Sequence, residues 1–458
     1  MDTPVYDFVR KYCGSKKTRF HMPGHKGSNV LLECEAMDIT EIKGADVLSH
    51  AEGIIKKSQL NASALFKSGA TFYSTEGSSH CIKTMLAVII DDVKRDNREK
   101  RPYIIAARNV HRAMIDACAL LDIDVEFILS EQSGNICENI LDASVLDKKL
   151  NDCCDRGNMP ACVYVTSPDY LGNIADLKGL SEVCDKYDIP LAVDNAHGAY
   201  LAFLEKNLHP IQLGAAICCD SAHKTLPVLT GGAYIHISDK YTGRYRDGIN
   251  KYFTVFGSTS PSYLIMQSLD LCNRYLADGY DKKLSECIRN VEKLKRFMKA
   301  NGVNIVDTEP LKIVIDAAAS GYTGDYVADE LRGYDIECEY SDRQFVVFMV
   351  TSQNDKTDFE RVVSWCQQSC IVNDKKEPIV YKNIYRKTPD RVMTIREAVF
   401  SASEFVDTED SQGRICASET ISCPPAVPIA VSGEIIDEQM VKLFKQYDIE
   451  KVCVTCKI

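Results

Sequence analysis

Short apolar runs alternate with amphipathic stretches between about residues 61 and 265. Longer segments with helical periodicity, such as 78–96 and 177–188, separate these runs. Alternation of this kind predicts a mostly parallel, doubly wound α/β sheet, and runs that are apolar on both faces are typical of buried parallel strands. Five runs predict strands: RPYIIAAR (101–108), VEFILS (125–130), ACVYVTSP (161–168), IPLAVDNAH (189–197) and GAAICCDSAHK (214–224).

The pattern changes after Ser262. Two long helical patterns, 263–279 and 283–302, precede two alternating runs at 311–318 and 343–352, which predicts a smaller α+β domain joined through a long helix. The polar stretch 373–390 is typical of a linker. We therefore predict four parts: an N-terminal arm (1–60), a large cofactor-binding domain (61–265), a small α+β domain (266–390) and a C-terminal domain (391–458).

Composition and charge narrow the function classes. The chain has no apolar stretch of 18 residues and no signal-peptide pattern, so we expect a cytoplasmic protein without a membrane span. The net charge of −11 disfavours nucleic-acid binding. The 20 cysteines are expected to be reduced thiols in such a chain. The pair Cys453 and Cys456 has no second pair at metal-binding spacing, and we expect no metal site.

Polar side chains follow the predicted strands directly, where an open α/β sheet binds its ligands. Asp194 ends one strand, and Lys224 follows the next strand within the cluster Ser221-Ala222-His223-Lys224. Pyridoxal phosphate (PLP) needs a lysine for a Schiff base and an acid that keeps its pyridine nitrogen protonated. Asp194 and Lys224 would supply both. Taken alone, Asp194 would more often be a helix cap or a loop carboxylate than a cofactor ligand.

A phosphate site is predicted where FYSTEGSSH (72–80) passes from a strand-like run into a helix. Ser78 and Ser79 would add hydroxyl donors to the backbone N–H groups of the helix N-terminus, although serine is also an ordinary helix cap. Ser221 and His223 could bind the same phosphate. His111 follows another strand end and could stack on the pyridine ring, although a lone histidine is more often structural.

These motifs together resemble the ornithine/lysine/arginine decarboxylase family, the group III PLP decarboxylases of fold type I. The resemblance runs from about Arg19 to Ile436. Its anchors are RFHMPGHKG (19–27), FYSTEGSSH (72–80), ARNVHRAM (107–114), TSPDYLGN (166–173), VDNAHGAYL (193–201), SAHKTLPVLTGG (221–232), STSPSYLIMQSLDL (258–271) and GRICASETISCPPAVPI (413–429). It implies the aspartate-aminotransferase-like fold and a basic amino acid as substrate.

The resemblance also implies roles for individual residues. Lys224 would carry the cofactor and Asp194 would pair with its pyridine nitrogen, while His111 would stack on one ring face and Ala196 would pack against the other. His197 would lie close to the cofactor. The phosphate would be held by Ser78, Ser79, Ser221 and His223. Ser258 matches a position that reaches the neighbouring subunit's phosphate, so the resemblance implies at least a homodimer with active sites at the interface.

The chain departs from the family pattern at Asn195, where glutamate is usual, at Asp220, where a neutral residue is usual, and at Cys423, which replaces a tyrosine. His21 also comes too early to leave room for the N-terminal wing domain of the large family members. The chain therefore resembles the short, wingless form, which puts a wing-mediated decamer in doubt.

The implied reaction decarboxylates arginine, lysine or ornithine to the corresponding amine, as in polyamine biosynthesis, and the short form slightly favours arginine. Lys224 or His223 would return the proton. Two rivals remain, namely another fold type I enzyme such as an aminotransferase, and a catalytically silent PLP-binding relative. Arg391, Arg396 and Arg414 keep the aminotransferase alternative open as carboxylate clamps. Candidate partners for the distal substrate group are Glu337, Glu339, Asp342, Glu397 and Glu419.

Overall fold

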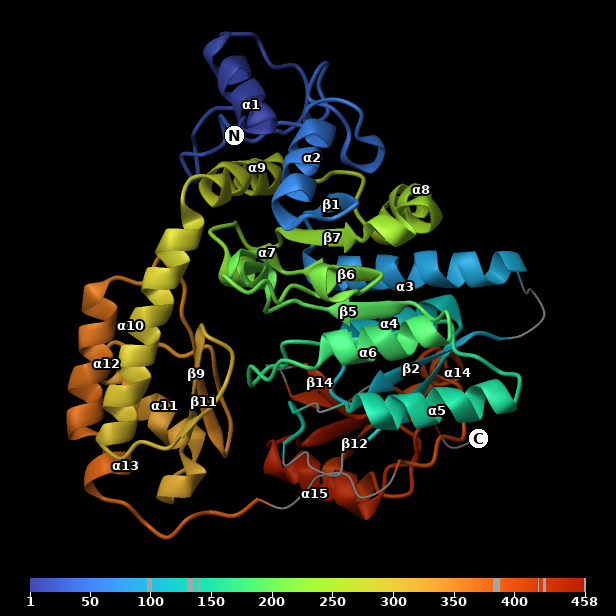
Figure 1. The fold of residues 1–458 in the computed structure, drawn as a ribbon, viewed down its shortest axis with the longest axis vertical. Coiled ribbons are helices and arrows are strands. Elements are labelled where there is room, and N and C mark those ends of the chain that lie inside the picture. The colour runs from blue at the N-terminus through green and yellow to red at the C-terminus, as the bar shows by residue number, and fades with distance from the viewer. Residues whose placement is uncertain are drawn as a thin grey trace. The chain divides into compact units, whose positions relative to one another are not determined.

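The computed structural model describes residues 1–96, 101–129, 135–138, 141–381, 388–418, 420–422 and 426–456. Figure 1 shows the helices and strands of the chain. The chain divides into two compact units. Unit 1 comprises Met1–Pro102, Ala161–Tyr164 and Leu177–Lys282, and unit 2 comprises Tyr103–Pro160, Val165–Asp176 and Lys283–Ile458. The four-part division expected from the sequence stays a prediction. No helix in the described part of the chain is long and apolar enough to cross a membrane.

The seven-stranded sheet has the strand order β1-β7-β6-β5-β4-β2-β3. β5 and β6 are parallel, as are β2 and β3, while β7 runs antiparallel to both of its neighbours. All five predicted strands are present, and the sheet adds β1 and β7 to them. The strands are β1 (Ala70–Ser74), β2 (Tyr103–Ala107), β3 (Asp124–Ile128), β4 (Val163–Thr166), β5 (Leu191–Asp194), β6 (Ile217–Asp220) and β7 (Ala233–Ile237).

In unit 1 the strands β1, β5, β6 and β7 are almost fully buried, as expected for runs that are apolar on both faces. Helix α3 packs against α8 and against β6 and β7. The helices of this unit are α1 (Pro4–Gly14), α2 (Ile54–Phe66), α3 (Gly77–Asp96), α6 (Leu177–Lys186), α7 (Ala222–Thr225), α8 (Asp239–Phe256) and α9 (Tyr263–Ala277), with short 3-10 turns at Leu48–His50, Ala199–Phe203 and Pro210–Leu213.

Unit 2 contains a second, four-stranded antiparallel sheet with the order β10-β11-β9-β8, where the sequence predicted an α+β region. Its strands are β8 (Ile305–Val306), β9 (Lys312–Asp316), β10 (Tyr340–Ser341) and β11 (Phe345–Met349). The helices of this unit begin with α4 (Arg112–Leu121) and α5 (Ala143–Asp155) and continue with α11 (Gly324–Arg332), α12 (Lys356–Gln368) and α13 (Cys370–Asn373); α10 (Tyr280–Ala300) starts at the unit boundary. A 3-10 turn spans Ala318–Ser320.

The C-terminal part of unit 2 forms two small antiparallel sheets, β12-β15 and β13-β14. Buried side chains from β14, α15 and β15 share one hydrophobic core with Phe345 and Val347 of β11. The elements are α14 (Ile395–Val399), β12 (Ser403–Asp407), a 3-10 turn at Thr408–Asp410, β13 (Thr420–Ser422), β14 (Val427–Ala430), α15 (Glu438–Gln446) and β15 (Lys451–Thr455).

A buried ion pair joins the end of β2 to this C-terminal part. The two guanidinium nitrogens of Arg108 lie 3.0 and 2.8 Å from the carboxylate oxygens of Glu434, which also accepts a bond from Val431 N. Removing one partner of such a pair leaves an unpaired buried charge, which costs about 3–5 kcal/mol. We expect Glu434→Ala to lower the urea unfolding midpoint strongly. Glu404→Ala, at a half-exposed pair with Arg414, is the matched control and should shift the midpoint little.

Candidate active site

The parallel strands β5 and β6 place Asp194 and the segment that carries Lys224 at the same edge of the sheet in unit 1. Asp194 lies opposite Cys219 in the strand register, and Ser221 follows β6 directly. The chain then turns into the short helix α7, which carries His223 and Lys224. The structure thus brings together the residues that the sequence singled out at two separate strand ends.

Lys224 is half-buried, and its amine Nζ lies 3.1 Å from His197 Nε2. The ring of His197 is almost fully buried. A lysine amine reacts as a nucleophile only when it is neutral, and an imidazole nitrogen can accept its proton. The pair is therefore arranged for a lysine that forms a covalent bond with a carbonyl carbon.

Asp194 is 2% exposed, so its carboxylate is held away from water. Its oxygens accept bonds from the hydroxyl of Tyr164 at 3.4 Å, from Ala196 N at 3.2 Å and from the thiol of Cys219 at 3.6 Å. These three donors are neutral. A carboxylate in this setting attracts a cationic ring nitrogen strongly, because the low local dielectric strengthens charge pairing.

The start of α3 has groups that could bind an anion. The hydroxyl of Ser221 donates to Ser78 Oγ at 2.8 Å, which links the segment before Lys224 to the first turn of this 20-residue helix. Gly77 has a φ of 74°, and its N–H donates to Gly231 O at 2.8 Å. A Cβ on Gly231 would lie 2.9 Å from Thr75 O, so glycine permits this close approach. Hydroxyls and helix N–H groups together suit a phosphate.

His223 has a defined tautomer when it is neutral. Its Nδ1 lies 3.0 Å from Gly232 O, which can only accept a hydrogen bond, so Nδ1 carries the proton. Nε2 is then the basic atom of the ring, able to accept or return a proton. Ser79 is half-buried in the first turn of α3, and Ala196 is buried two residues after Asp194.

Two further predicted site residues, Ser258 and His111, bond to other residues. Ser258 is exposed after α8, where its N–H donates to Glu76 Oε1 at 2.6 Å. His111 belongs to unit 2, where its Nδ1 accepts the N–H of Ala113 and caps α4. Its stacking on the cofactor and the reach of Ser258 to a second subunit stay predictions.

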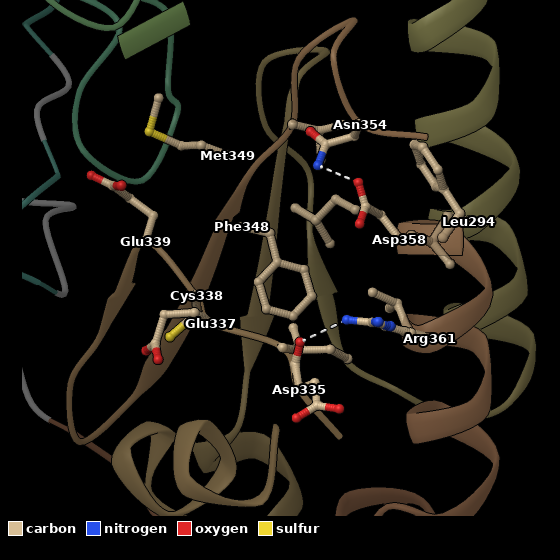
Figure 2. Close-up of a pocket in the computed structure, with 15 residues that line it drawn as sticks. Leu294, Asp335, Glu337, Cys338, Glu339, Phe348, Met349, Asn354, Asp358 and Arg361 are labelled. Atoms are coloured by element: carbon tan, nitrogen blue, oxygen red, sulfur yellow. Dashed lines mark hydrogen bonds between the residues drawn. The ribbon is translucent and has the colours of Figure 1, made fainter. Parts of the chain in front are cut away.

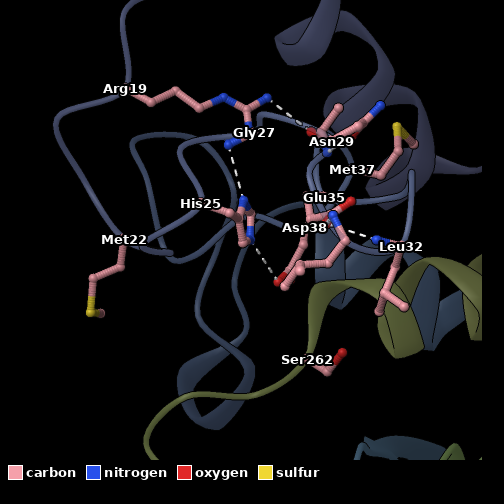
Figure 3. Close-up of polar contacts among 12 residues, drawn as sticks. Arg19, Met22, His25, Gly27, Asn29, Leu32, Glu35, Met37, Asp38 and Ser262 are labelled. Carbon is pink, nitrogen blue, oxygen red and sulfur yellow. Dashed lines mark hydrogen bonds and ion pairs between the residues drawn. The ribbon is translucent and has the colours of Figure 1, made fainter.

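The motif at residues 19–27 folds mainly on itself and its near neighbours in the N-terminal arm (Figure 3). His25 accepts the N–H of Gly27 on Nδ1, and its Nε2 lies 3.3 Å from Asp38. A Cβ on Gly27, whose φ is 77°, would lie 2.4 Å from the Arg19 guanidinium. This glycine is therefore required by the turn.

The candidate partners of the distal substrate group lie in unit 2. Glu337 and Glu339 line a pocket of about 310 Å³, in which they lie across Phe348 from Arg361 (Figure 2). Glu337 pairs with Arg332, and Glu339 accepts the hydroxyl of Tyr170. Asp342 is different, because it is buried and bonded to Tyr340, Asn135 and two backbone N–H groups.

Burial raises the pKa of Asp342, which is consistent with a structural role. Glu397 closes a capping box at the start of α14. Glu419 and Cys423 lie outside the described residues. The three candidate arginine clamps also make structural bonds, in each case to backbone carbonyls: Arg391 to Val125, Arg396 to Ala119 and Leu120, and Arg414 to Thr455.

The cysteines in the described part of the chain are free thiols. Within the same residues, one group of potential metal ligands is close enough to hold an ion: His209, Cys218 and Asp220. Cys453 and Cys456 are not part of it. Sequence reasoning had noted Asp220 only as a departure from the family, and it had missed His209, His236 and Tyr164.

The sheet, the strand-end aspartate and the lysine on the following turn define a fold type I enzyme that uses pyridoxal phosphate, and the amine, buried carboxylate and hydroxyls fit this cofactor. The chain belongs to the Orn/Lys/Arg decarboxylase family, whose major-domain model matches residues 3–317 and whose C-terminal-domain model matches residues 379–449. It is therefore a carbon-carbon lyase that decarboxylates a basic amino acid.

Curated relatives and solved structures agree with this family. The chain is 27% identical to an arginine decarboxylase of Bacillus subtilis, covering 98% of this chain and 94% of that protein. It is 28% identical to an arginine decarboxylase of Halalkalibacterium halodurans, with 95% and 91% covered. A lysine decarboxylase of Pseudomonas aeruginosa has a similar fold, with a TM-score of 0.79, 15% identity and 97% and 76% covered.

Proposed function

We propose that this protein is an arginine decarboxylase that acts in the cytoplasm and supplies the amine product to polyamine biosynthesis. The observation that carries the substrate is the similarity to curated arginine decarboxylases over nearly the whole chain. The free thiols of the described residues are consistent with a reducing compartment.

In this proposal, Lys224 holds the cofactor covalently, and its 3.1 Å contact with His197 Nε2 gives the amine a proton acceptor. Ser78, Ser79, Ser221 and His223 hold the phosphate at the start of α3. His111 and Ala196 pack on the two ring faces.

Bound pyridoxal phosphate supplies an electron sink for the bond that breaks at the carboxylate. Asp194 keeps the ring nitrogen protonated, which makes that sink effective. The proton that replaces carbon dioxide comes from Lys224 Nζ or from His223. The buried setting of Asp194 supports this electrostatic role, since water would otherwise screen it.

We also propose a homodimer, or a higher homo-oligomer, with Ser258 reaching the neighbouring subunit's site. The N-terminal arm supports this proposal. Its apolar side chains Phe20, Met22, Val30, Leu31 and Leu32 are between 62% and 94% exposed. Exposed apolar side chains can form part of a protein interface, and a second copy of this chain would cover them.

The substrate is tested by supplying arginine, lysine and ornithine separately to the PLP-loaded enzyme and measuring released carbon dioxide. We expect kcat/KM to be at least about 10-fold higher for arginine, because a site built for a guanidinium leaves polar groups unpaired with a shorter amine. If carbon dioxide were released only from lysine or only from ornithine, the assignment of arginine as substrate would be wrong, while the assignment as a decarboxylase would stand. A 2-oxo acid without carbon dioxide would point to the aminotransferase alternative.

A further inference from the structure

A buried polar cluster lies beside the candidate active site in unit 1. The Asp220 cluster, as we name it, consists of Asp220, Asn195, His209 and His236. Asp220 is fully buried at the end of β6. Its Oδ1 accepts a bond from Asn195 Nδ2 at 2.7 Å, and its Oδ2 lies 3.0 Å from His209 Nε2 and 3.3 Å from His236 Nε2.

The strand register explains why these groups meet. Side chains two residues apart share a strand face, so Cys218 and Asp220 lie on the same face of β6. His236 of β7 lies opposite Cys218. Its other ring nitrogen lies 2.8 Å from Thr71 Oγ1, and the ring of Phe66 is centred 4.4 Å from it.

Asp220 is held as a carboxylate. Burial alone would favour the neutral acid, but His209 and His236 outweigh it and keep the pKa of Asp220 below its usual value. Burial lowers the pKa of His236, which favours a neutral ring. Its Nε2 lies near Asp220 Oδ2 without the geometry of a hydrogen bond. A buried carboxylate without hydrogen-bond donors would lower the stability of the fold. The hydrogen bonds of the Asp220 cluster therefore hold its side chains in place.

Asp220 connects the two segments that carry the cofactor residues. It precedes the Ser221–Lys224 segment, and its partner Asn195 directly follows Asp194. The N–H of Asn195 donates to Cys219 O at 2.9 Å, and the N–H of Gly198 donates to Asn195 O at 2.8 Å. A Cβ on Gly198 would lie 2.0 Å from Asn195 Oδ1, so this turn closes tightly around the Asn195 side chain.

We propose that Asp220 is a positioning residue of the active site, which acts through Asn195 to hold the turn 194–198 and therefore both Asp194 and His197. The proposal rests on the cofactor roles proposed above for Asp194 and Lys224. Two of the three residues that depart from the family pattern thus act as one unit: the Asp220 carboxylate at the end of β6 and the Asn195 amide next to Asp194.

A metal ion is the competing explanation, since His209, Cys218 and Asp220 have ligand atoms within 4.8 Å of one another. The contacts favour hydrogen bonding, because the two oxygens of Asp220 already lie 2.7 Å from Asn195 Nδ2 and 3.0 Å from His209 Nε2. A metal would have to displace the hydrogen bond between His209 and Asp220 and remove the proton of the Cys218 thiol, whose pKa burial raises well above its usual value.

The test compares the PLP-loaded wild-type enzyme with Asp220→Asn, Asn195→Ala and the exchange variant Asn195→Asp/Asp220→Asn. We expect each single change to lower kcat about 10- to 100-fold and to shift the visible absorbance band of the bound cofactor, because small displacements of catalytic groups are that costly. The exchange variant restores a carboxylate-amide pair. It should recover at least about 10-fold in kcat and return the band towards wild type.

Asp270→Asn is the matched control, since Asp270 is a buried carboxylate of unit 1 bonded to Val5 N, Tyr6 N and Ser58. It should alter stability and leave the band and kcat near wild type. If Asp220→Asn fails to fold, Asn195→Ala, which keeps the histidine contacts of Asp220, decides the question through the same readouts.

Unchanged band and kcat in folded single variants would overturn the proposal, as would an exchange variant no better than Asp220→Asn. One zinc ion per chain in the purified enzyme, lost in Cys218→Ala, would replace it with a metal site. A different result would show that the proposed function itself is wrong. In that case the wild-type enzyme itself would lack a cofactor band that depends on Lys224.

Discussion

Lys224→Ala is expected to abolish the covalent attachment of the cofactor and to lower kcat by about 10⁴-fold or more, a loss typical of removing the nucleophile from a catalytic unit. The amine of Lys224 lies 3.1 Å from His197 Nε2, where a proton acceptor favours its reactive neutral form. The measurement is the visible absorbance of the purified protein, followed by carbon dioxide release at saturating arginine. Lys240→Ala, at an exposed lysine paired with Asp185, is the control.

A cofactor band that persists in Lys224→Ala, together with turnover near wild type, would show that another group carries the cofactor. The same variant tests the shared active site. A hybrid of Lys224→Ala and Ser258→Ala subunits contains one site with both residues intact if Ser258 reaches across the interface. Such hybrids should regain activity above the level of either parent, whereas sites built within one subunit would show no gain.

The fold was largely predictable, and the strand that the sequence missed shows where such prediction fails. β7 reads AYIHI, with His236 in the middle of a fully buried run. A polar ring within a buried strand weakens the apolar signal on which prediction relies. The two neighbouring strands place polar groups beside this ring: Thr71 Oγ1 bonds to Nδ1 at 2.8 Å, and Asp220 Oδ2 lies 3.3 Å from Nε2. Those partners are distant in sequence and invisible before the strand order is known.

The candidate site likewise contains residues that could be predicted from the sequence and contacts that could not. Lys224, Asp194 and Ser221 could be predicted because each follows an apolar run, and parallel strands end at a common edge. The link between Asn195 and Asp220 could not, since 25 residues separate two departures that look independent along the chain. Only the pairing of β5 with β6 brings them together. The position of a residue after a predicted strand therefore indicates whether it lies near the site. Which of these residues contact one another depends on the order in which the strands pair.

Asp194→Asn is expected to lower kcat by about 10³-fold or more and to leave cofactor binding nearly intact. The amide keeps the size of the carboxylate and can still accept the N–H of Ala196, which Asp194 accepts at 3.2 Å. The amide lacks the negative charge that keeps the pyridine nitrogen protonated. The expected decrease in kcat therefore reflects weaker electrostatic stabilisation of the transition state. Titration of the apoenzyme with PLP and carbon dioxide release at saturation separate the two effects.

A cofactor analogue methylated at the pyridine nitrogen tests directly whether Asp194 acts by keeping that nitrogen positively charged. The analogue carries a permanent positive charge and needs no carboxylate to maintain it. In Asp194→Asn, we expect the analogue to restore part of the lost activity relative to PLP, provided that the methyl group fits beside the substituted amide. The wild-type enzyme should gain nothing from the same exchange. Equal loss with both cofactors would instead assign Asp194 a structural role, through its bonds to Tyr164, Ala196 and Cys219.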